Sequence, residues 1–533
     1  MLISKNRYLK WAIIAVLITT LIVVPLLFVL EGLAVGNNPN VQHINKYLLK
    51  DLFLTTLRMI IGVSIISFLL AVPAAYLTAN YQFPLRRFLL KANILPLAIP
   101  TYIMAFVYAS FFSISGVLNK VLTSIFPNMD LVSKVDVLNE GWLMFFLSFA
   151  LYPYIYSVAL VTFSLKNKSI DEAAANLGAS GWKRFFKISF PIALPAIFGG
   201  VSLVAMEVLN DYGAMSYFNV NTITAGIFQA KQMDFIGSVY LSAITFIVIL
   251  SFFTGYYLIK SYRKISLLKP ASTNNDLYDT GKKRKLLISF FVFLPFFFGF
   301  IIPIIELFFL ASSRISVIFS SEFLRVTLNS VQLAIIPAVI IMIFSFILLY
   351  NQYLNNGFKS RFLNAIANVG YAVPGAIIAV AVMAFIFVFD NEEKTVYHFL
   401  INSLILLIFA YIIRFMAVGF NTLESGFNQV AHNLPNSART LGANSFKTLT
   451  KVYFPMLKTT FFTGLAIVTV DILKELPMTL LLQRFNFNTL ATITYEKAKV
   501  SESVQDAAPY ALLLIFVGTL AVLFLVKSDR RVE

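Results

Sequence analysis

Four carboxylates occupy matching places in two otherwise apolar stretches of the sequence. Glu207 and Asp211 lie near the end of one stretch, and Asp471 and Glu475 lie 264 residues further along in the other. Carboxylates within a membrane span are costly, so they need a structural or functional reason. Together with the phenol of Tyr212 they supply oxygen donors, which hard, highly charged cations prefer. The spacing of four predicts that both carboxylates of a pair share one helix face.

The same acids could instead brace helices, because Lys474 lies between Asp471 and Glu475 and could neutralise either one. The three histidines are scattered and there is no cysteine, so we expect no soft-metal path, disulfide or thiol chemistry. Whether the acids contact a metal is left unknown by the sequence. It also contains no phosphate-binding G-x-x-x-x-G-K-[ST] loop, no H-E-x-x-H and no nucleophile motif. We therefore expect no catalytic residues and no covalently bound cofactor.

The elements that position these acids are predicted to be membrane-spanning helices. Of the 533 residues, 59% are hydrophobic and only 13% are charged, with a mean hydropathy of +0.81. The stretches Trp11–Leu30 and Leu286–Ile305 carry no charge. About 20 such residues cross a hydrocarbon core of roughly 30 Å. We expect an all-α integral membrane protein in contact with lipid.

The net charge of +17 could suggest nucleic acid, but its distribution argues for a membrane. Basic residues gather in every second loop, as they do on the cytoplasmic side of membrane proteins. This pattern predicts a multi-pass protein with both termini in the cytoplasm and no nucleic-acid partner. The basic clusters lie at residues 5–10, 86–91, 166–187, 282–285, 359–361, 439–451 and 527–531.

Hydropathy predicts about twelve spans in two halves. The first half is 1–263, a polar cytoplasmic linker follows at 264–285, and the second half is 286–533. Six spans per half give the halves the same orientation, which allows a pore between them. The expected spans are 11–31, 53–79, 93–113, 141–165, 190–210, 235–260, 287–311, 326–350, 363–389, 396–418, 456–476 and 507–527.

Short sequence matches support an internal repeat. They pair Thr56-Leu57 with Thr327-Leu328, Ile99-Pro100 with Val373-Pro374, Leu177-Gly178-Ala179 with Leu441-Gly442-Ala443, and Phe190-Pro191 with Phe454-Pro455.

The loop after the fourth span of each half, at 171–191 and 436–455, is the most specific feature. A helix-forming run ends at a glycine, basic residues follow, and a proline opens the next span. This pattern predicts a short cytoplasmic helix that docks into a partner, although an ordinary interfacial helix is the alternative. The positions are Glu172, Ala173, Ala174, Gly178, Ile188 and Pro191 in the first copy, and Asn436, Ser437, Ala438, Gly442, Val452 and Pro455 in the second.

These residues resemble the EAA loop of ATP-binding-cassette (ABC) importer permeases. The first copy matches the family spacing in full, whereas Asn436 and Ser437 replace the leading Glu and first Ala of the second copy. The resemblance implies a type I importer permease fold and two copies of a separate ATPase subunit that uses ATP and Mg²⁺. It also implies that docking is weaker at the second loop, because Glu172 has no carboxylate counterpart there.

The stretches after each loop, Leu209–Phe228 and Leu473–Thr492, resemble ferric-iron importer permeases of the fused two-half type. The resemblance implies a bacterial inner (plasma) membrane protein that takes up Fe³⁺ handed over by an external iron-binding protein. Glu207, Asp211, Tyr212, Asp471 and Glu475 would then line the substrate pathway.

Other functions stay open on the sequence alone. The same machinery carries thiamine, polyamines or phosphonates in related permeases, and four acids do not distinguish iron from a polyamine. A twelve-helix secondary transporter would need no ATPase, so it would leave the paired loops without a purpose. A membrane-embedded enzyme has no supporting constellation of residues.

Overall fold

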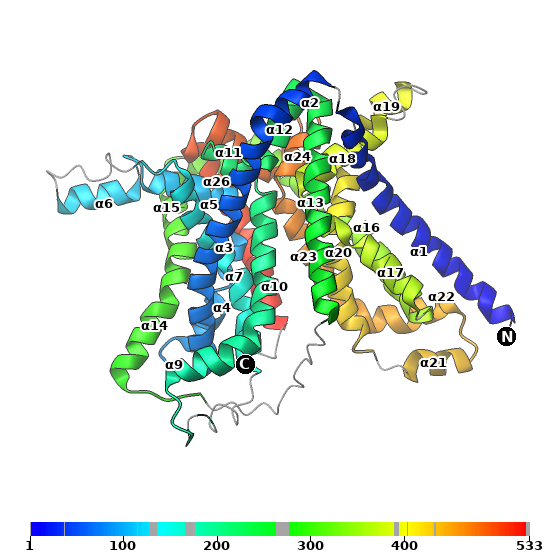
Figure 1. Cartoon of the computed structure of the whole chain (residues 1–533), viewed down its shortest axis with the longest axis horizontal. Coiled ribbons are helices and arrows are strands. Elements are labelled where there is room, and N and C mark those ends of the chain that lie inside the picture. Colours follow the sequence, from blue (N-terminus) through cyan, green and yellow to red (C-terminus); the bar gives the residue numbers. More distant parts are fainter. Residues whose placement is uncertain are drawn as a thin grey trace. The chain divides into compact units, whose positions relative to one another are not determined.

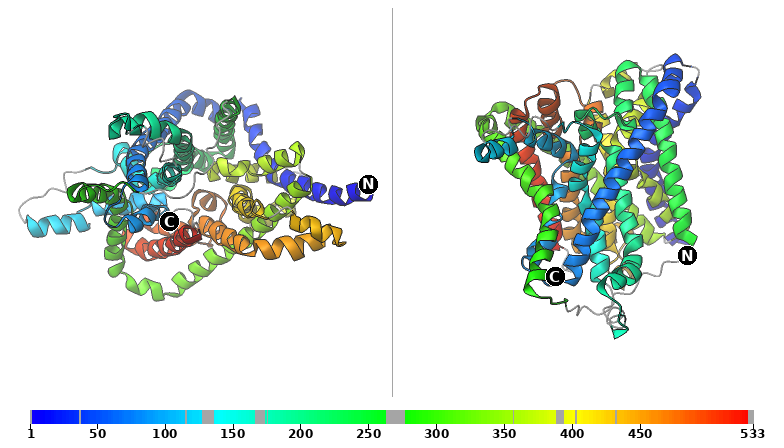
Figure 2. Two further views of the ribbon diagram at one scale, coloured as in Figure 1. Left: turned by 90° about the horizontal axis from the view of Figure 1, so that it is seen from below. Right: turned by 60° about the vertical axis from the view of Figure 1, so that its left-hand side comes forward.

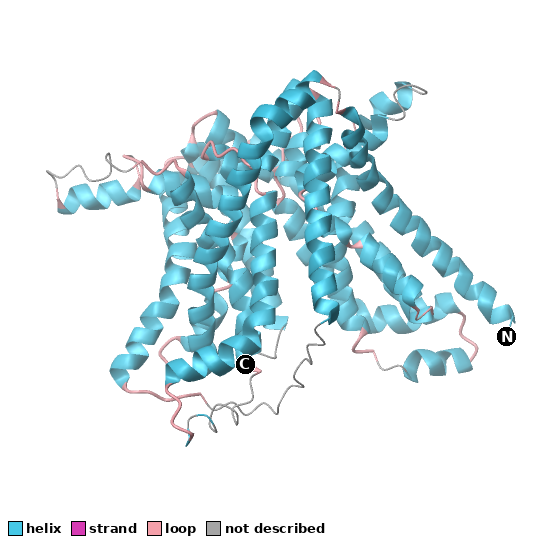
Figure 3. Ribbon diagram, in the orientation of Figure 1, coloured by secondary structure: helices cyan, strands magenta, loops and turns pink. Residues whose placement is uncertain are grey.

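The computed structural model describes residues 2–36, 38–114, 116–126, 136–165, 174, 176–262, 277–355, 357–387, 394–401, 403–430 and 433–528. Within these ranges the regular structure is helical, apart from one isolated β-bridge between Tyr81 and Tyr278 (Figures 1 and 3). The predicted all-α fold class is confirmed.

The helices up to the linker, with 3₁₀ and π segments labelled η, are α1 (Leu2–Phe28), η1 (Val29–Val35), α2 (Pro39–His43), η2 (Ile44–Leu48), α3 (Leu49–Asn80), α4 (Arg86–Ala92), η3 (Leu95–Ala98), α5 (Thr101–Phe111), α6 (Val117–Ile125), α7 (Glu140–Ser164), α9 (Gly181–Arg184), η4 (Phe185–Ser189), α10 (Phe190–Asn210), α11 (Gly213–Tyr217), α12 (Ile223–Met233) and α13 (Phe235–Tyr262).

The helices after the linker are α14 (Lys282–Phe296), η5 (Phe297–Ile301), α15 (Ile302–Ser312), η6 (Ile315–Phe319), α16 (Ser321–Leu354), α17 (Phe358–Ala367), η7 (Val369–Ala372), α18 (Gly375–Phe387), α19 (Lys394–Ile401), α20 (Ile405–Phe427), α21 (Asn433–Thr440), α22 (Ser445–Thr448), η8 (Leu449–Tyr453), α23 (Phe454–Lys474), α24 (Pro477–Leu482), α25 (Leu490–Tyr495), η9 (Glu496–Val500) and α26 (Val504–Ser528).

Nine helices in the described part of the chain are long and apolar enough to cross a membrane, or up to eleven if each of two bent pairs counts as one span. The expected sixth span corresponds to α13, whose segment Phe235–Ser251 is a shorter apolar helix by the same measure. The expected tenth span, 396–418, lies later than predicted, because α20 runs from Ile405 to Phe427.

The third span of each half is broken rather than continuous. The helix 86–98 meets α5 at an angle of 96°, and 358–372 meets α18 at 112°. The breaks fall at Ile99-Pro100 and Val373-Pro374, where Ile99 and Val373 are extended. A proline disfavours the helical conformation of the residue before it, so the helix ends there. The expected continuous spans 93–113 and 363–389 were therefore wrong at these points.

The chain folds into two compact units that do not follow the order of the sequence. Unit 1 comprises 1–49, 226–251 and 320–493, and unit 2 comprises 50–225, 252–319 and 494–533. Helix α1 and most of α13 therefore belong to the unit formed mainly by the second half, and α14 and α26 belong to the unit formed mainly by the first half. The repeat boundaries at 263 and 286 remain a prediction, and linker residues 264–276 lie outside the described residues.

In unit 1, α1 packs against α16, α17 and α18 of the second half. The ring of Trp11 lies 5.0 Å from that of Tyr350, and the ring of Phe28 lies 5.2 Å from that of Phe385, both edge to face. Such aromatic pairs add to the burial of apolar area. The first span of the chain is therefore held by its second half.

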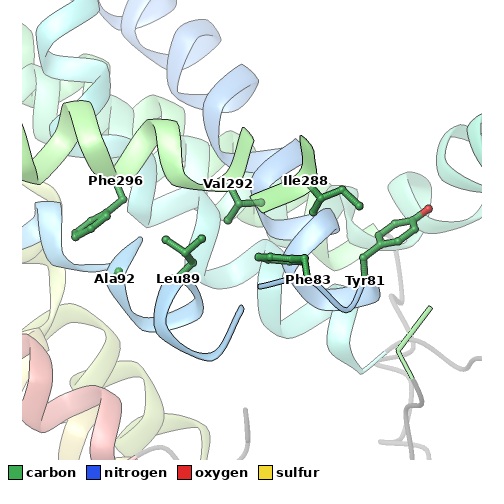
Figure 4. Packing of buried hydrophobic residues seen from close by; sticks show 7 residues of the cluster. All are labelled: Tyr81, Phe83, Leu89, Ala92, Ile288, Val292 and Phe296. Atoms are coloured by element: carbon green, nitrogen blue, oxygen red, sulfur yellow. The ribbon is translucent and has the colours of Figure 1, made fainter. Parts of the chain in front are cut away.

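In unit 2, α14 and α15 pack against α4 and α5 of the first half, and α26 lies beside α15 (Figure 2). A buried apolar cluster joins α14 to α4 and the turn before it (Figure 4). The members of this cluster are Tyr81, Phe83, Leu89, Ala92, Ile288, Val292 and Phe296.

We expect Gly370→Ala to destabilise the protein, because a Cβ at Gly370 would lie 2.0 Å from the backbone oxygen of Ile413. The overpacking should lower the free energy of unfolding by about 1–3 kcal/mol, measured by denaturant titration in detergent. Gly199→Ala is the control, since a Cβ there meets no atom within 4 Å. Equal stabilities of the two variants would contradict the close approach of η7 to α20.

Candidate functional site

The two loops after the fourth spans end their short helices in the same way. Gly178 and Gly442 have φ of +79° and +82°, the left-handed conformation that glycine adopts at no steric cost. The N–H of Ala179 donates to Ala174 O at 2.9 Å, and the N–H of Ala443 donates to Ala438 O at 3.0 Å. These bonds are the mark of a Schellman cap. The predicted end of the helix at a glycine is confirmed, whereas Glu172 and Ala173 lie outside the described residues.

The fifth span begins earlier than the sequence predicted. A new helix starts three residues after each glycine, with Ser180 and Asn444 as N-caps. It then runs on as 181–210 and 445–474, with a π turn just before Pro191 and Pro455. The sequence predicted that each proline opens the span. Instead, both prolines lie inside a longer helix. A π turn accommodates the missing N–H of proline without a break.

Large apolar side chains are exposed around both glycines. Leu177 and Leu441 are 88% and 89% exposed, and Trp182 and Phe446 are 74% and 64% exposed. These residues recur at the same offset of 264, so the exposure is a property of the repeat. Ser437 on α21 is exposed as well. Exposed apolar anchors of this kind are typical of surfaces that bind a protein partner.

At the opposite end of the fifth span, each half places one acid just past the last helical residue. Asp211 and Glu475 are extended and only 6% and 7% exposed. Asp211 Oδ1 accepts a hydrogen bond from the N–H of Ala214 at 2.8 Å. Glu475 accepts from the N–H groups of Met478 and Thr479 at 3.0 and 3.1 Å. Each acid therefore caps the short helix that follows it, α11 or α24.

The prediction that each pair of acids shares one helix face was wrong, because the helix ends between them. Glu207 and Asp471 stay on α10 and α23, partly exposed. Glu207 accepts a hydrogen bond from Tyr154 at 3.2 Å, and Lys474 Nζ lies 3.9 Å from Asp471 Oδ1. Lys474 therefore pairs with Asp471, one of the two acids that it was predicted to neutralise.

Hydroxyl groups of the second span support the next helix of each half. The N–H of Ile223, at the start of α12, donates to Thr56 Oγ1 at 2.9 Å. The N–H of Leu490, at the start of α25, donates to Ser330 Oγ at 2.7 Å. The structural counterpart of Thr56 is therefore Ser330, and the sequence match of Thr56 to Thr327 was wrong.

Arg414 is a buried cation that was not among the residues predicted from the sequence. It lies on α20, is 7% exposed, and donates from Nη1 to Val373 O at 2.8 Å. That oxygen belongs to the broken ninth span. Its charge also acts on both Asp471 and Glu475. An arginine among apolar residues of a predicted span is itself a signal of a functional or structural site.

Burial changes the acidity of the capping acids, which lie just beyond the ends of the spans. Burial raises the pKa of Asp211 to about 6, although the bond from the Ala214 N–H opposes the shift. Burial also raises the pKa of Glu475, and the positive charge of Arg414 opposes it. Tyr212, whose ring lies 6.0 Å from that of Tyr495, is next to Asp211. No group of three or more His, Cys, Asp or Glu among the described residues could hold a metal ion.

These features define a multi-pass membrane protein built from two repeats, each with an exposed loop at one end of its fifth span and an acid-capped helix at the other. The family model for the inner membrane component of binding-protein-dependent transport systems matches residues 67–263 and 353–533. The chain belongs to this family of importer permeases. The relatives named below are transport permeases, not enzymes.

The chain is similar to permeases for different solutes. It is 24% identical over 523 residues to the Fe(3+)-transport system permease protein FbpB 2 of Haemophilus influenzae, with 97% of both chains covered. It is 27% identical over 205 residues to a probable sulfate transport system permease protein of Chlorella vulgaris, covering 37% of this chain and 74% of the relative. The sulfate permease protein CysW of Escherichia coli is 25% identical over 219 residues, covering 39% and 70%.

Stability should depend on pH through Asp211. Its pKa in the folded state lies above the ordinary value of 3.8, so the folded state binds the proton more tightly than the unfolded state. We expect the free energy of unfolding of the wild type, relative to Asp211→Asn, to fall by roughly 3 kcal/mol between about pH 4 and pH 6 and to level off above.

Denaturant titrations in detergent at pH 4 to 8 measure this difference. Asp51→Asn is the control, because Asp51 is an exposed acid of the same unit. A difference between wild type and Asp211→Asn that does not change with pH would contradict the burial of an acid at this position.

Proposed function

We propose that this chain is the permease subunit that moves ferric iron across a bacterial inner (plasma) membrane. The observation that carries the proposal is similarity along the whole chain, since the Fe(3+) permease of Haemophilus influenzae covers 97% of it. The sulfate permeases cover well under half of it. Iron would arrive on an external iron-binding protein, in keeping with the binding-protein dependence of the family.

The ATP hydrolysis that drives uptake is proposed to take place in a separate subunit, because the chain lacks a phosphate-binding loop. Two copies of that ATPase, using ATP and Mg²⁺, would each dock on one exposed loop. The exposed Leu177 and Trp182, and the matching Leu441 and Phe446, support this arrangement. Basic residues concentrated near both loops are consistent with loops and termini in the cytoplasm. The residues proposed to couple the permease to the ATPase remain Glu172, Ala173, Ala174, Gly178, Pro191, Ser437, Ala438, Gly442 and Pro455.

The proposed substrate pathway involves the acids at the far ends of the fifth spans. Glu207 and Asp471 are partly exposed, so they can contact a cation without giving up a helix cap. Asp211 and Glu475 are engaged as caps, and their part would be to fix the position of α11 and α24. Tyr212 follows Asp211 and adds a phenol to this region. Carboxylate and phenol oxygens are suitable transient ligands for a trivalent cation.

Sulfate is the second candidate, because permeases named for sulfate match part of the chain. Uptake of radiolabelled ferric citrate and of radiolabelled sulfate can be compared in cells that express or lack this chain. We expect expression to raise iron uptake at least fivefold and to leave sulfate uptake unchanged. Increased sulfate uptake with unchanged iron uptake would assign sulfate as the substrate. If uptake of neither solute increased, both assignments would be contradicted.

The docking loop can be tested by a pair of glycine variants. A Cβ at Gly178 or at Gly181 meets no atom within 4 Å, but only Gly178 has a positive φ. Gly178→Ala should therefore strain the cap by about 1–2 kcal/mol, whereas Gly181→Ala should not.

We expect Gly178→Ala to reduce co-purification of the ATPase and iron uptake at least threefold, with normal amounts of the permease in the membrane. Gly181→Ala should behave as the wild type. If Gly178→Ala showed wild-type co-purification of the ATPase and wild-type iron uptake, the left-handed turn would have no role in docking.

A further inference from the structure

Two lysines reach from one half of the sequence to the acid-capped helix of the other half. In unit 1, Lys231 Nζ at the end of α12 donates to Leu481 O on α24 at 2.8 Å. In unit 2, Lys499 Nζ on η9 donates to Asn219 Oδ1 at 3.0 Å, just after α11. Each contact lies within one compact unit and joins opposite halves of the repeat.

Both contacts fall at the carboxyl-terminal end of a short helix. Leu481 is the second-to-last residue of α24, so its carbonyl has no partner in the next helical turn. Asn219 adopts φ of +56° and its N–H donates to Ser216 O, which closes the end of α11. Lys499 Nζ also lies 5.9 Å from the ring centroid of Tyr217, the last residue of α11. A cation is favourable at this end of a helix.

The two lysines are not copies of one another. Lys231 is eight residues after the start of α12, whereas Lys499 is nine residues after the start of α25. One binds a backbone carbonyl and the other a side-chain amide. The same arrangement therefore arises twice with different local chemistry. Both lysines are partly buried, and burial lowers the pKa of each, so an oxygen partner compensates the loss of water around the ammonium.

We propose that Lys231 and Lys499 are positioning residues for transport, which clamp α24 and α11 from the opposite half of the chain. Each short helix is then fixed at both ends. Its own half supplies the acid at the amino-terminal end, and the other half supplies the lysine at the carboxyl-terminal end. A movement of α12 would therefore displace α24 and the turn that bears Glu475. A movement of η9 would displace α11 and the turn that bears Asp211. The role in transport rests on the proposed function, whereas the clamp itself does not.

The absence of native cysteine allows the clamp to be measured directly. Met478→Cys on α24 and Ala214→Cys on α11 place single thiols at fully buried positions. N-ethylmaleimide labelling of the full-length protein in membrane vesicles reports how often each helix is displaced. We expect Lys231→Met to raise labelling on α24 at least fivefold and leave α11 unchanged. Lys499→Met should do the reverse.

Arginine variants distinguish the cation from packing. Lys231→Arg and Lys499→Arg should label within twofold of the wild-type rates, and so should Lys46→Met, which removes an exposed lysine of unit 1. Wild-type labelling in both methionine variants would overturn the clamp. So would arginine variants that label as fast as the methionine variants.

The transport arm uses ferric citrate uptake divided by ATP hydrolysis in the same vesicles, with the ATPase subunit co-expressed. We expect the double variant Lys231→Met, Lys499→Met to lower this ratio about tenfold, with recovery in the double arginine variant. An unchanged ratio despite faster labelling would overturn the role in transport. A wild type that moves no iron would contradict the proposed function, while the labelling result would still decide the clamp.

Discussion

The structure depends on one constraint, which is that a backbone polar group has no water to bind inside a membrane. Continuous helices satisfy it internally, but this chain interrupts its helices at corresponding places in both halves. The third spans break at Ile99 and Val373, and the fifth spans end at Asn210 and Lys474. Polar side chains in an otherwise apolar protein bind the backbone at these interruptions and at the short helices that follow them. Carboxylates and hydroxyls accept hydrogen bonds from N–H groups, and a guanidinium and an ammonium donate to carbonyl oxygens.

The two halves satisfy corresponding backbone N–H groups with different side chains. Asp211 and Glu475 both cap a short helix, and Thr56 and Ser330 both support the helix that follows. The helix ends are conserved between the halves in geometry rather than in side-chain type. Direct comparison of the two sequence halves therefore finds the loops at Gly178 and Gly442, where the positive φ favours glycine, but pairs Thr56 with the wrong residue.

The sequence was sufficient for the all-α fold class and for the glycine caps at Gly178 and Gly442. Apolar length predicts a span because the hydrocarbon thickness is fixed, and a left-handed turn at the end of a helix favours glycine. The breaks in the third spans could also have been predicted, since Pro100 and Pro374 disfavour helix at the residue before them. Arg414 could have been noticed as a lone cation in a span. Each of these signals is local.

The predictions that were wrong concern features that depend on tertiary contacts. Spacing of four predicts a shared face only if the helix continues, and nothing in Glu207 and Asp211 themselves reveals that it stops at Asn210. Likewise, hydropathy gives the position of a span in the sequence but not its neighbour in space. The exchange of first and last helices between the units, and the reach of Lys231 to Leu481, therefore required the structure.

The exchange of helices has a consequence for biosynthesis. The main partners of α1 are α16, α17 and α18, so α1 must wait after its own synthesis for residues 321–387 before it can pack against them. Nearly three hundred residues are synthesised in between. During that time the apolar surface of α1 faces lipid, or a membrane insertase, rather than its final neighbours. The packing of α1 is therefore completed late, after the long stretch between it and its neighbours has been synthesised.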